Sequence, residues 1–174
     1  VGTVSSRDVE TLGRVGVVFQ QPKSSLNPRW RLRRSIAEPL SRRGGADDRI
    51  DERISELCSL VEISPSVAAS RPDAVSGGQA QRAALARAIA DDPEILLLDE
   101  PVSVLDAPTR AAVVSLLEAL HASREGATST VVVSHDLGTV GQLADRIVVL
   151  DDGAIVERGP VDELLSAPEH RRTR

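Results

Sequence analysis

Two adjacent carboxylates, Asp99 and Glu100, are the side chains of this sequence best suited to chemistry. They follow the run Ile95 to Leu98, whose four apolar residues do not alternate with polar ones and therefore predict a strand buried on both faces of a parallel sheet. Ligands of open α/β sheets bind at the carboxyl ends of such strands. At that edge Asp99 would suit a magnesium ion, and Glu100 would suit the polarisation of a water that attacks phosphorus, although acidic residues after a strand are also common surface caps.

A glutamine and a histidine end two other predicted strands. Gln20 follows the apolar run Val15 to Phe19, and His135 lies just after the run Thr130 to Val133. A lone histidine at a strand end is usually a satisfied polar residue. Three parallel strands would, however, bring Gln20, the carboxylate pair and His135 to one edge of a sheet, and we interpret that edge as a functional site.

The tetrapeptide Ser76-Gly77-Gly78-Gln79 stands at the start of an alanine-rich helix predicted over 79–90. A serine and two glycines at a helix N-terminus expose backbone N–H groups at the positive end of the helix dipole, which favours phosphate. The same residues fit a plain N-cap after a flexible turn equally well. The tetrapeptide alone leaves both interpretations open.

The elements that must position these residues alternate between helix and strand. Such alternation predicts an α/β fold with a parallel sheet. Apolar residues at three- and four-residue spacing predict one amphipathic helix over 49–61, and Asp151-Asp152-Gly153 between two short apolar runs predicts a hairpin. The expected strands cover 15–19, 95–98, 130–133, 147–150 and 154–156, and the expected helices cover 49–61, 79–90, 109–121 and 137–144.

Composition indicates a cytosolic protein and argues against nucleic-acid binding. The 174 residues are 41% apolar, enough to bury the core of one domain, and the apolar runs are far shorter than the ~20 residues of a membrane span. The single Cys58 cannot form an internal disulfide. The net charge of -5 opposes contact with phosphate backbones, and the arginines between Arg29 and Arg43 are the local exception.

Five phrases in order resemble the motifs of ATP-binding cassette (ABC) transporter ATPases, and their spacing matches that family throughout. VVFQQP resembles the Q-loop, VSGGQ the signature, ILLLDEP the Walker B strand, SVLD the D-loop and VVVSHDL the switch-histidine loop. Val75 in the signature and Val104 in the D-loop are mild departures from the family pattern.

The resemblance implies a P-loop NTPase-like fold, which is an α/β core with a parallel sheet and an inserted helical subdomain. Residues 1–20 and 91–158 would form the catalytic core, 21–90 the helical subdomain with the Q-loop and signature, and 159–174 a C-terminal tail. The helical subdomain would meet a membrane partner, so its arginines are interpreted as a solvated or docking face.

The resemblance further implies that two such domains face each other head to tail and share their nucleotide sites. Each ATP would lie between the phosphate loop of one domain and Ser76, Gly77, Gly78 and Gln79 of the other. Asp106 would cross the dimer interface.

Catalytic roles follow from the same resemblance. Gln20 would contact Mg2+ and the attacking water, and Asp99 would hold the metal. Glu100 would act as the base, and His135 would touch the γ-phosphate. Phosphoryl transfer of this kind depends on positioning and charge neutralisation rather than covalent chemistry.

Two phrases, QQPKSSLNPRW and LLSAPEH, most resemble importer ATPases for dipeptides, oligopeptides or nickel. The implied function is ATP hydrolysis that powers import of peptides or a similar small solute. The implied partners are a second ABC ATPase subunit, identical or different, and transmembrane permease subunits, with no nucleic acid. The implied place is the cytoplasmic face of the cell membrane, as a peripheral protein.

A phosphate loop, which needs glycines and a lysine, does not occur in the sequence. The only lysine, Lys23, follows Pro22 with no glycine run before it and cannot serve. Gly2-Thr3-Val4 resembles the strand that follows the phosphate-loop helix, so we expect a truncation just before it and no activity of the chain alone.

Three hypotheses remain on the sequence alone. The favoured one is a fragment of a working importer ATPase. The others are a degenerate partner that gives only the signature half-site in trans, and an inert interaction remnant. A repair-type ABC ATPase is disfavoured, because neither a long heptad segment nor a cysteine metal cluster is present.

Overall fold

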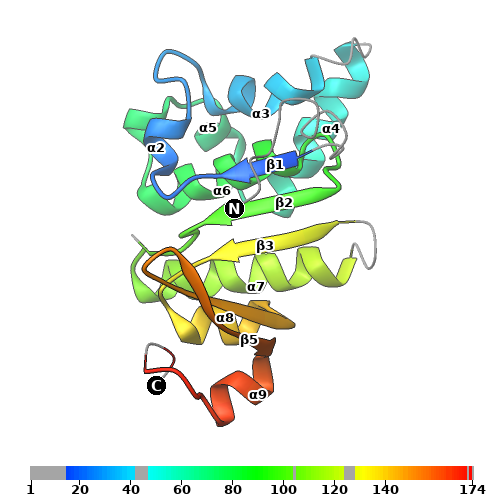
Figure 1. Cartoon of the computed structure of the whole chain (residues 1–174). Helices are drawn as coiled ribbons and strands as arrows, with labels where there is room; N and C mark the ends of the chain where they lie inside the picture. Colours follow the sequence, from blue (N-terminus) through cyan, green and yellow to red (C-terminus); the bar gives the residue numbers. More distant parts are fainter. Residues whose placement is uncertain (1–14, 42–46, 104, 124–127, 172, 174) are drawn as a thin grey trace. The chain divides into compact units, whose positions relative to one another are not determined.

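The computed structural model describes residues 15–41, 47–103, 105–123, 128–171 and 173 (Figure 1). The expectations for Gly2-Thr3-Val4 and for Val104 fall outside these residues. The chain divides between Val133 and Ser134 into two compact units, each with its own packing. Among the described residues, no helix is both long and apolar enough to cross a membrane.

The first unit is built on a three-stranded parallel sheet, as the sequence predicted. Strands β1 (Val15–Val18), β2 (Ile95–Asp99) and β3 (Ser129–Val133) lie in the order β1-β2-β3. Each strand is rich in β-branched or leucine side chains, which suit a pleated, buried surface. Figure 1 shows the three arrows pointing the same way, so their carboxyl ends share one edge.

The prediction that the β2 strand is buried on both faces was wrong. Leu96 and Leu98 are buried, whereas Ile95 and Leu97 are only half-buried. Successive side chains of a strand point to opposite faces. Within the described residues, therefore, only one face of β2 is fully covered.

Helix α6 (Gly77–Ile89) is the centre of the first unit. Its alanines let neighbouring backbones approach closely, and it packs against β1, α2 (Pro22–Ser25), α3 (Leu32–Ser41) and α4 (Asp47–Leu60). A Cβ on Gly16 would lie 2.2 Å from the carbonyl O of Ala88, so only glycine fits where β1 meets α6. Arg87 donates to the carbonyl O of Ser25 at 2.7 Å and thereby fixes the end of α2.

The remaining helices between β1 and α6 are short and close-packed. Helix α4 confirms the amphipathic pattern predicted over 49–61. Helix α5 (Pro65–Ala68) begins with Ser64 as a cap, whose side chain accepts from the N–H of Val67, and a 3-10 turn, η1 (Pro72–Ala74), follows. The fully buried side chains of this region include Leu26, Leu32, Ile36, Ile54, Leu57 and Val61.

Helix α7 (Ala107–Ser123) runs between β2 and β3 in the chain and contacts α6. Its buried side chains, Val113, Val114, Leu117 and Leu120, recur at three- and four-residue spacing and form its core face. The helix predicted over 109–121 is confirmed, with two more residues at each end.

The second unit contains a hairpin between two helices. Strands β4 (Arg146–Asp151) and β5 (Ala154–Pro160) pair antiparallel, and helices α8 (Leu137–Leu143) and α9 (Val161–Ser166) flank them in the chain. Asp152 and Gly153 both have positive φ, 48° and 76°, as a two-residue type I′ turn requires, which confirms the predicted hairpin. Val140, Ile147 and Leu164 form its small apolar core.

A single glutamate binds the C-terminal tail to this hairpin. The carboxylate of Glu157 on β5 accepts from the backbone N–H of Glu169 at 2.9 Å and of His170 at 3.2 Å, and from Oγ1 of Thr173 at 2.5 Å. These hydrogen bonds, first that from Glu169, hold the pKa of Glu157 below its ordinary value. Glu157 thus holds the tail to the hairpin, and an ion pair between Arg171 and Asp151 at 3.7 Å adds a second contact.

Candidate functional site

The carboxyl edge of the parallel sheet brings together two of the predicted catalytic positions. Val18 is in register with Leu98, and Asp99 is in register with Val133. Gln20 therefore leaves β1 at the edge where Asp99 ends β2, which is the place where open α/β sheets bind ligands. Gln20 is exposed and Asp99 half-buried, so both can reach a ligand from solvent.

Glu100 has an unusual backbone conformation. Its φ of 47° lies in the left-handed region, which is uncommon for a residue with a long side chain. Its N–H donates to the carbonyl O of Val133 at 2.8 Å, so the strand ladder continues one residue past β2. Strained backbone that the surroundings hold in place is concentrated at functional sites. The left-handed turn lies immediately after Asp99, at the carboxyl end of β2.

His135 belongs to the second unit, two residues after the end of β3. The loop around it is fixed by its neighbours: the N–H of Asp136 donates to Oγ of Ser134 at 3.1 Å. Asp136 in turn caps α8, accepting from the N–H of Gly138 at 3.0 Å and from Oγ1 of Thr139 at 2.9 Å. His135 itself is exposed, between Ser134 and Asp136.

The tetrapeptide before α6 forms a capping box. Oγ of Ser76 accepts from the N–H of Gln79 at 3.1 Å, and Oε1 of Gln79 accepts from the N–H of Ser76 at 3.0 Å. The N-cap interpretation of these residues is therefore confirmed. It does not exclude an anion site, because the two interpretations use different atoms.

In the capping box the side chains of Ser76 and Gln79 act as acceptors, so their own donor groups remain available. Oγ of Ser76 still carries its own hydrogen, and the amide NH2 of Gln79 keeps two donors. Gly77 and Gly78 occupy the first two helical positions, whose N–H groups have no acceptor within the helix. The start of α6 thus offers O–H and N–H donors at the positive end of the helix dipole, a combination that suits phosphate oxygens.

The two glycines of this tetrapeptide differ in whether packing against the rest of the chain requires a glycine. A Cβ on Gly78 would lie 2.3 Å from Cγ2 of Thr109, so the contact with α7 demands glycine. A Cβ on Gly77 would meet nothing within 4 Å. Packing inside the described chain therefore explains Gly78 and leaves Gly77 without an internal reason.

Asp106 caps α7, a role that the sequence analysis did not assign. Its carboxylate Oδ1 accepts from the N–H of Thr109 at 3.0 Å, and its carbonyl O accepts from the N–H of Arg110 at 2.8 Å. The backbone and then the side-chain hydrogen bonds from Thr109 hold the pKa of Asp106 below its ordinary value. Asp106 remains exposed, so the capping role leaves it open to an outside contact.

Thr109 is the residue that sequence reasoning missed. It touches Gly78 with its methyl group and Asp106 with its N–H, and so joins the starts of α6 and α7. The local signal was present, because threonine three residues after an aspartate fits a helix N-terminus. The contact with Gly78 spans more than thirty residues of sequence and could not be inferred from spacing.

Comparison with known proteins establishes the family. The family model described as "ABC transporter" matches residues 3–103, which include the sheet edge at Gln20 and Asp99 and the capping box. The chain belongs to the ABC transporter family. The predicted fold class, a P-loop NTPase-like α/β core with a parallel sheet, is confirmed by this match and by the solved structures below.

Several proteins with similar sequences are named as transport or import ATP-binding proteins. The oligopeptide transport ATP-binding protein OppD of Mycobacterium tuberculosis is 39% identical over 175 residues, which cover 100% of this chain and 28% of OppD. OppF of Escherichia coli is 38% identical over 92% of this chain and 48% of OppF. The methionine import protein MetN 2 of Pectobacterium atrosepticum is 38% identical over 92% of this chain and 46% of MetN 2. The chain spans half or less of these relatives.

Solved ABC cassettes share the fold. A dimeric ATP-binding cassette in a post-hydrolysis state, bound to ADP and Pi, superposes with a TM-score of 0.77 at 30% identity, over 90% of this chain and 68% of that cassette. A second dimeric structure of a bacterial ABC transporter cassette gives the same TM-score at 29% identity.

Proposed function

We propose that this chain hydrolyses ATP as part of an ABC importer for peptides or a similar small solute. The observation that carries the proposal is the sheet edge where Gln20, Asp99 and the left-handed Glu100 follow adjacent parallel strands. Names of relatives favour peptide import, although one relative imports methionine, so the solute class is the finer part of the proposal.

The residues at the sheet edge fit the Mg2+ of an ATP site, while the sequence holds no phosphate loop that would bind the β- and γ-phosphates. Mg2+ is usually held by one or two side-chain oxygens together with substrate phosphates, and Asp99 and Gln20 supply that oxygen set. Bound there, the metal would neutralise charge on the β- and γ-phosphates. Glu100 would accept the proton of the attacking water. For His135, which belongs to the second unit, the contact with the γ-phosphate stays an expectation from the family resemblance.

The start of α6 would serve a second nucleotide site in trans. Ser76, Gly77 and Gln79 would donate to the phosphates of ATP held by the phosphate loop of a facing subunit. The absence of any neighbour around a Cβ on Gly77 supports this role, because a ligand that approaches the backbone would require that open space. Asp106 would contact the facing subunit from the cap of α7.

The proposed partners follow from this arrangement. They are a second ABC ATPase subunit and transmembrane permease subunits, at the cytoplasmic face of the membrane. The solved cassettes similar to this chain are dimeric. Nucleic acid is not a proposed partner, since the net charge of -5 opposes it.

The test mixes the purified protein with an ABC ATPase whose phosphate loop is intact and whose signature serine is mutated. We expect Mg-ATP hydrolysis in the mixture, because this chain would supply a working signature to the partner's nucleotide. Ser76→Ala in this chain should reduce the recovered rate by at least about tenfold, which corresponds to the loss of a charge-assisted hydrogen bond.

Two variants make the outcome specific. Glu100→Gln tests the chain's own catalytic edge and should leave the rate that depends on the partner's site largely unchanged. Ser66→Ala is the matched control, since it removes an exposed serine hydroxyl between Pro65 and Val67, away from the capping box. No recovery in the mixture would overturn the signature role, and an equal loss with Ser66→Ala would show that the effect is not local.

A further inference from the structure

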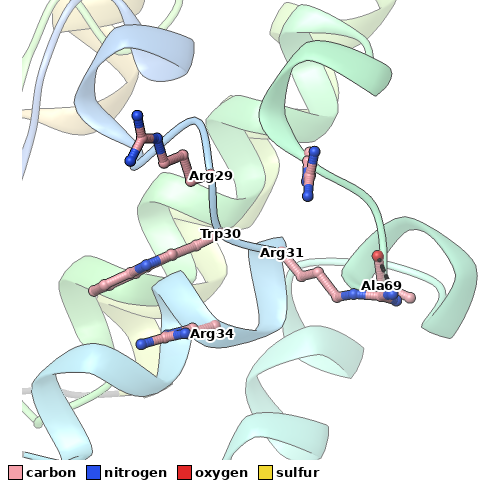
Figure 2. A pocket seen from close by; sticks show the side chains of 6 residues that line it. Arg29, Trp30, Arg31, Arg34 and Ala69 are labelled. Carbon is pink, nitrogen blue, oxygen red and sulfur yellow. Dashed lines mark hydrogen bonds between the residues drawn. The ribbon is translucent and has the colours of Figure 1, made fainter.

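A pocket rich in arginine lies in the first unit, and its lining includes no residue of the sheet edge or of the capping box (Figure 2). Its volume is about 390 Å³. We call it the arginine pocket, and it is lined by Arg29, Trp30, Arg31, Arg34, Ala69 and Arg71. None of these residues has a role in the proposed ATP chemistry.

Two segments distant in sequence build the arginine pocket. The N–H of Leu32 donates to the carbonyl O of Ser70 at 2.9 Å, which ties the start of α3 to the turn before η1. Nη1 of Arg31 donates to the carbonyl O of Ala69 at 3.1 Å and closes one side. The pocket is thus part of the packed helical region, and one backbone and one side-chain hydrogen bond join its two segments.

Trp30 and Arg34 form the aromatic wall. The guanidinium carbon of Arg34 lies 4.4 Å from the centre of the Trp30 ring, a cation–π distance. Figure 2 shows Arg34 alongside the ring, while Arg31 turns away toward Ala69. Stacking holds the Arg34 guanidinium plane in place, which lowers the entropy lost when it binds a planar anion.

The positive charges of the arginine pocket are not neutralised by the described part of the chain. Arg29, Arg34 and Arg71 form no ion pair with any described carboxylate. The acidic residues nearest in sequence, Glu38 and Asp73, do not line the pocket. Arg33, by contrast, is paired with Asp51 at 2.8 Å and lies outside the lining. The pocket therefore collects guanidinium groups that have no counter-ion among the residues that the structure describes.

We infer that the arginine pocket is a docking site for an acidic segment of a protein partner, whose paired carboxylates bind Arg29, Arg34 and Arg71. Guanidinium groups bind carboxylates in a planar, bidentate fashion. Tryptophan and arginine are also the residues that contribute most to protein–protein binding energy. The proposal does not rest on ATP hydrolysis.

Charge favours a protein partner over a membrane or a nucleic acid. The chain as a whole carries a net charge of -5, which opposes the binding of an extended polyanion. A short acidic segment places its negative charge only in the pocket. It therefore gains the local attraction without the wider repulsion.

The test uses Trp30 as its own reporter, since the sequence contains one tryptophan and no tyrosine. A short synthetic helical peptide with glutamates four residues apart is titrated into the purified protein without nucleotide, and Trp30 fluorescence is followed. We expect a saturable change that is absent with the peptide in which glutamines replace the glutamates. Binding should weaken at high salt, because exposed charges are screened.

Three variants locate the binding. Arg34→Ala and Arg29→Ala should each weaken the peptide about tenfold, as the loss of a bidentate ion pair implies. Arg34→Lys keeps the charge without the planar fork and should also weaken binding. Arg158→Ala is the matched control, because it removes an exposed arginine of β5 in the second unit.

Each other result overturns the proposal. Equal binding of the glutamine peptide would exclude carboxylate recognition, and an equal loss with Arg158→Ala would show general charge attraction. Tighter binding of vesicles containing phosphatidylglycerol, or of single-stranded DNA, through the same arginines would assign the arginine pocket to phosphate groups instead. Because no nucleotide is present, none of these results bears on the proposed ATPase.

Discussion

The methyl group of Thr109 occupies the space where a side chain of Gly78 would begin, 2.3 Å from the ideal Cβ position. Through this contact the first turn of α6 rests on the first turn of α7. Thr109 also donates its N–H to Asp106, so this one residue links Gly78 of the signature to Asp106 of the D-loop. We therefore expect a substitution in one motif to alter the packing of the other.

Gly78→Ala should destabilise the fold by about 1–3 kcal/mol, the usual cost of overpacking. The clash is with a short, β-branched side chain that cannot rotate away freely. Thr109→Ser removes the methyl group and keeps the hydroxyl, so the double variant should recover most of the lost stability. Thermal unfolding of the two single variants and the double variant measures this coupling.

Gly77→Ala is the natural comparison for Gly78→Ala. No atom lies within 4 Å of its added Cβ, so we expect unfolding at the same temperature or slightly above it. In the mixed ATPase assay, however, the added methyl would obstruct the proposed approach of phosphate to the backbone. A loss of stability in Gly77→Ala, or full activity, would contradict the separation of the two glycines.

Glu100→Gly and Glu100→Ala should differ in stability although both remove the carboxylate. Alanine keeps the left-handed backbone under strain at a φ of 47°, whereas glycine adopts it freely. The glycine variant should therefore be more stable by about 1 kcal/mol, after the glycine entropy cost is subtracted from the strain. Denaturant unfolding of the pair checks this. Equal stability would mean that the turn relaxes when the glutamate is lost.

Asp106 offers a way to separate a cap from an interface. Asp106→Asn keeps an oxygen that can accept from Thr109, so the melting temperature should stay near that of the parent protein. Asp106→Ala removes the cap and should lower it. If the charge of Asp106 acts across a subunit interface, Asp106→Asn should still reduce hydrolysis. Activity that simply follows melting temperature would argue for the cap alone.

The C-terminal tail should detach from Glu157 of the hairpin at low pH. Because hydrogen bonds hold the pKa of Glu157 below its ordinary value, the stabilisation is fully present above the unfolded-state pKa of about 4.3. It is lost as the pH falls through the lower, folded-state pKa. Hydrogen-exchange protection of the Glu169 and His170 amides should fall over that range.

Two variants control the acid experiment. Glu157→Gln should show low protection of the same amides already at neutral pH and no further acid step. Glu163→Gln, which alters an exposed side chain of α9 outside this cluster, should behave like the parent protein. The pKa of Asp106 is also held below its ordinary value. Because Asp106 caps α7, its protonation would affect amides at the start of α7 and not the amides of Glu169 and His170.

Elements with a strong local pattern were predictable from sequence. The periodic apolar residues of α4 and α7, the β-branched runs of β1 and β3, and the Asp152-Gly153 turn all lie where expected. In each case the signal sits within one element, so neighbours in space are not needed to read it.

Features that depend on distant partners were not predictable. The half-buried face of β2 depends on what covers it, which an unbroken apolar run does not reveal. The sequence predicts a helical patch around Ile36 and Leu40, which is confirmed, whereas the full extent of helix α3 from Leu32 to Ser41 was not predicted. The Glu157 cluster and the arginine pocket join segments separated by a dozen or more residues, and no spacing rule connects them.

The structure brings part of the predicted site to one sheet edge, and the roles of its residues stay predictions. Gln20 and Asp99 follow neighbouring parallel strands, which strand order alone could suggest. The left-handed turn at Glu100 and the capping of α7 by Asp106 could not be inferred, since both depend on hydrogen bonds formed after folding.

Helix α2 has a practical consequence for spectroscopy. Lys23 is the only lysine of the sequence, is exposed, and lies in α2, three residues after Gln20. Because no other lysine side chain occurs in the sequence, an amine-reactive dye would label this side chain. The result is a fluorophore beside the sheet edge, introduced without any substitution.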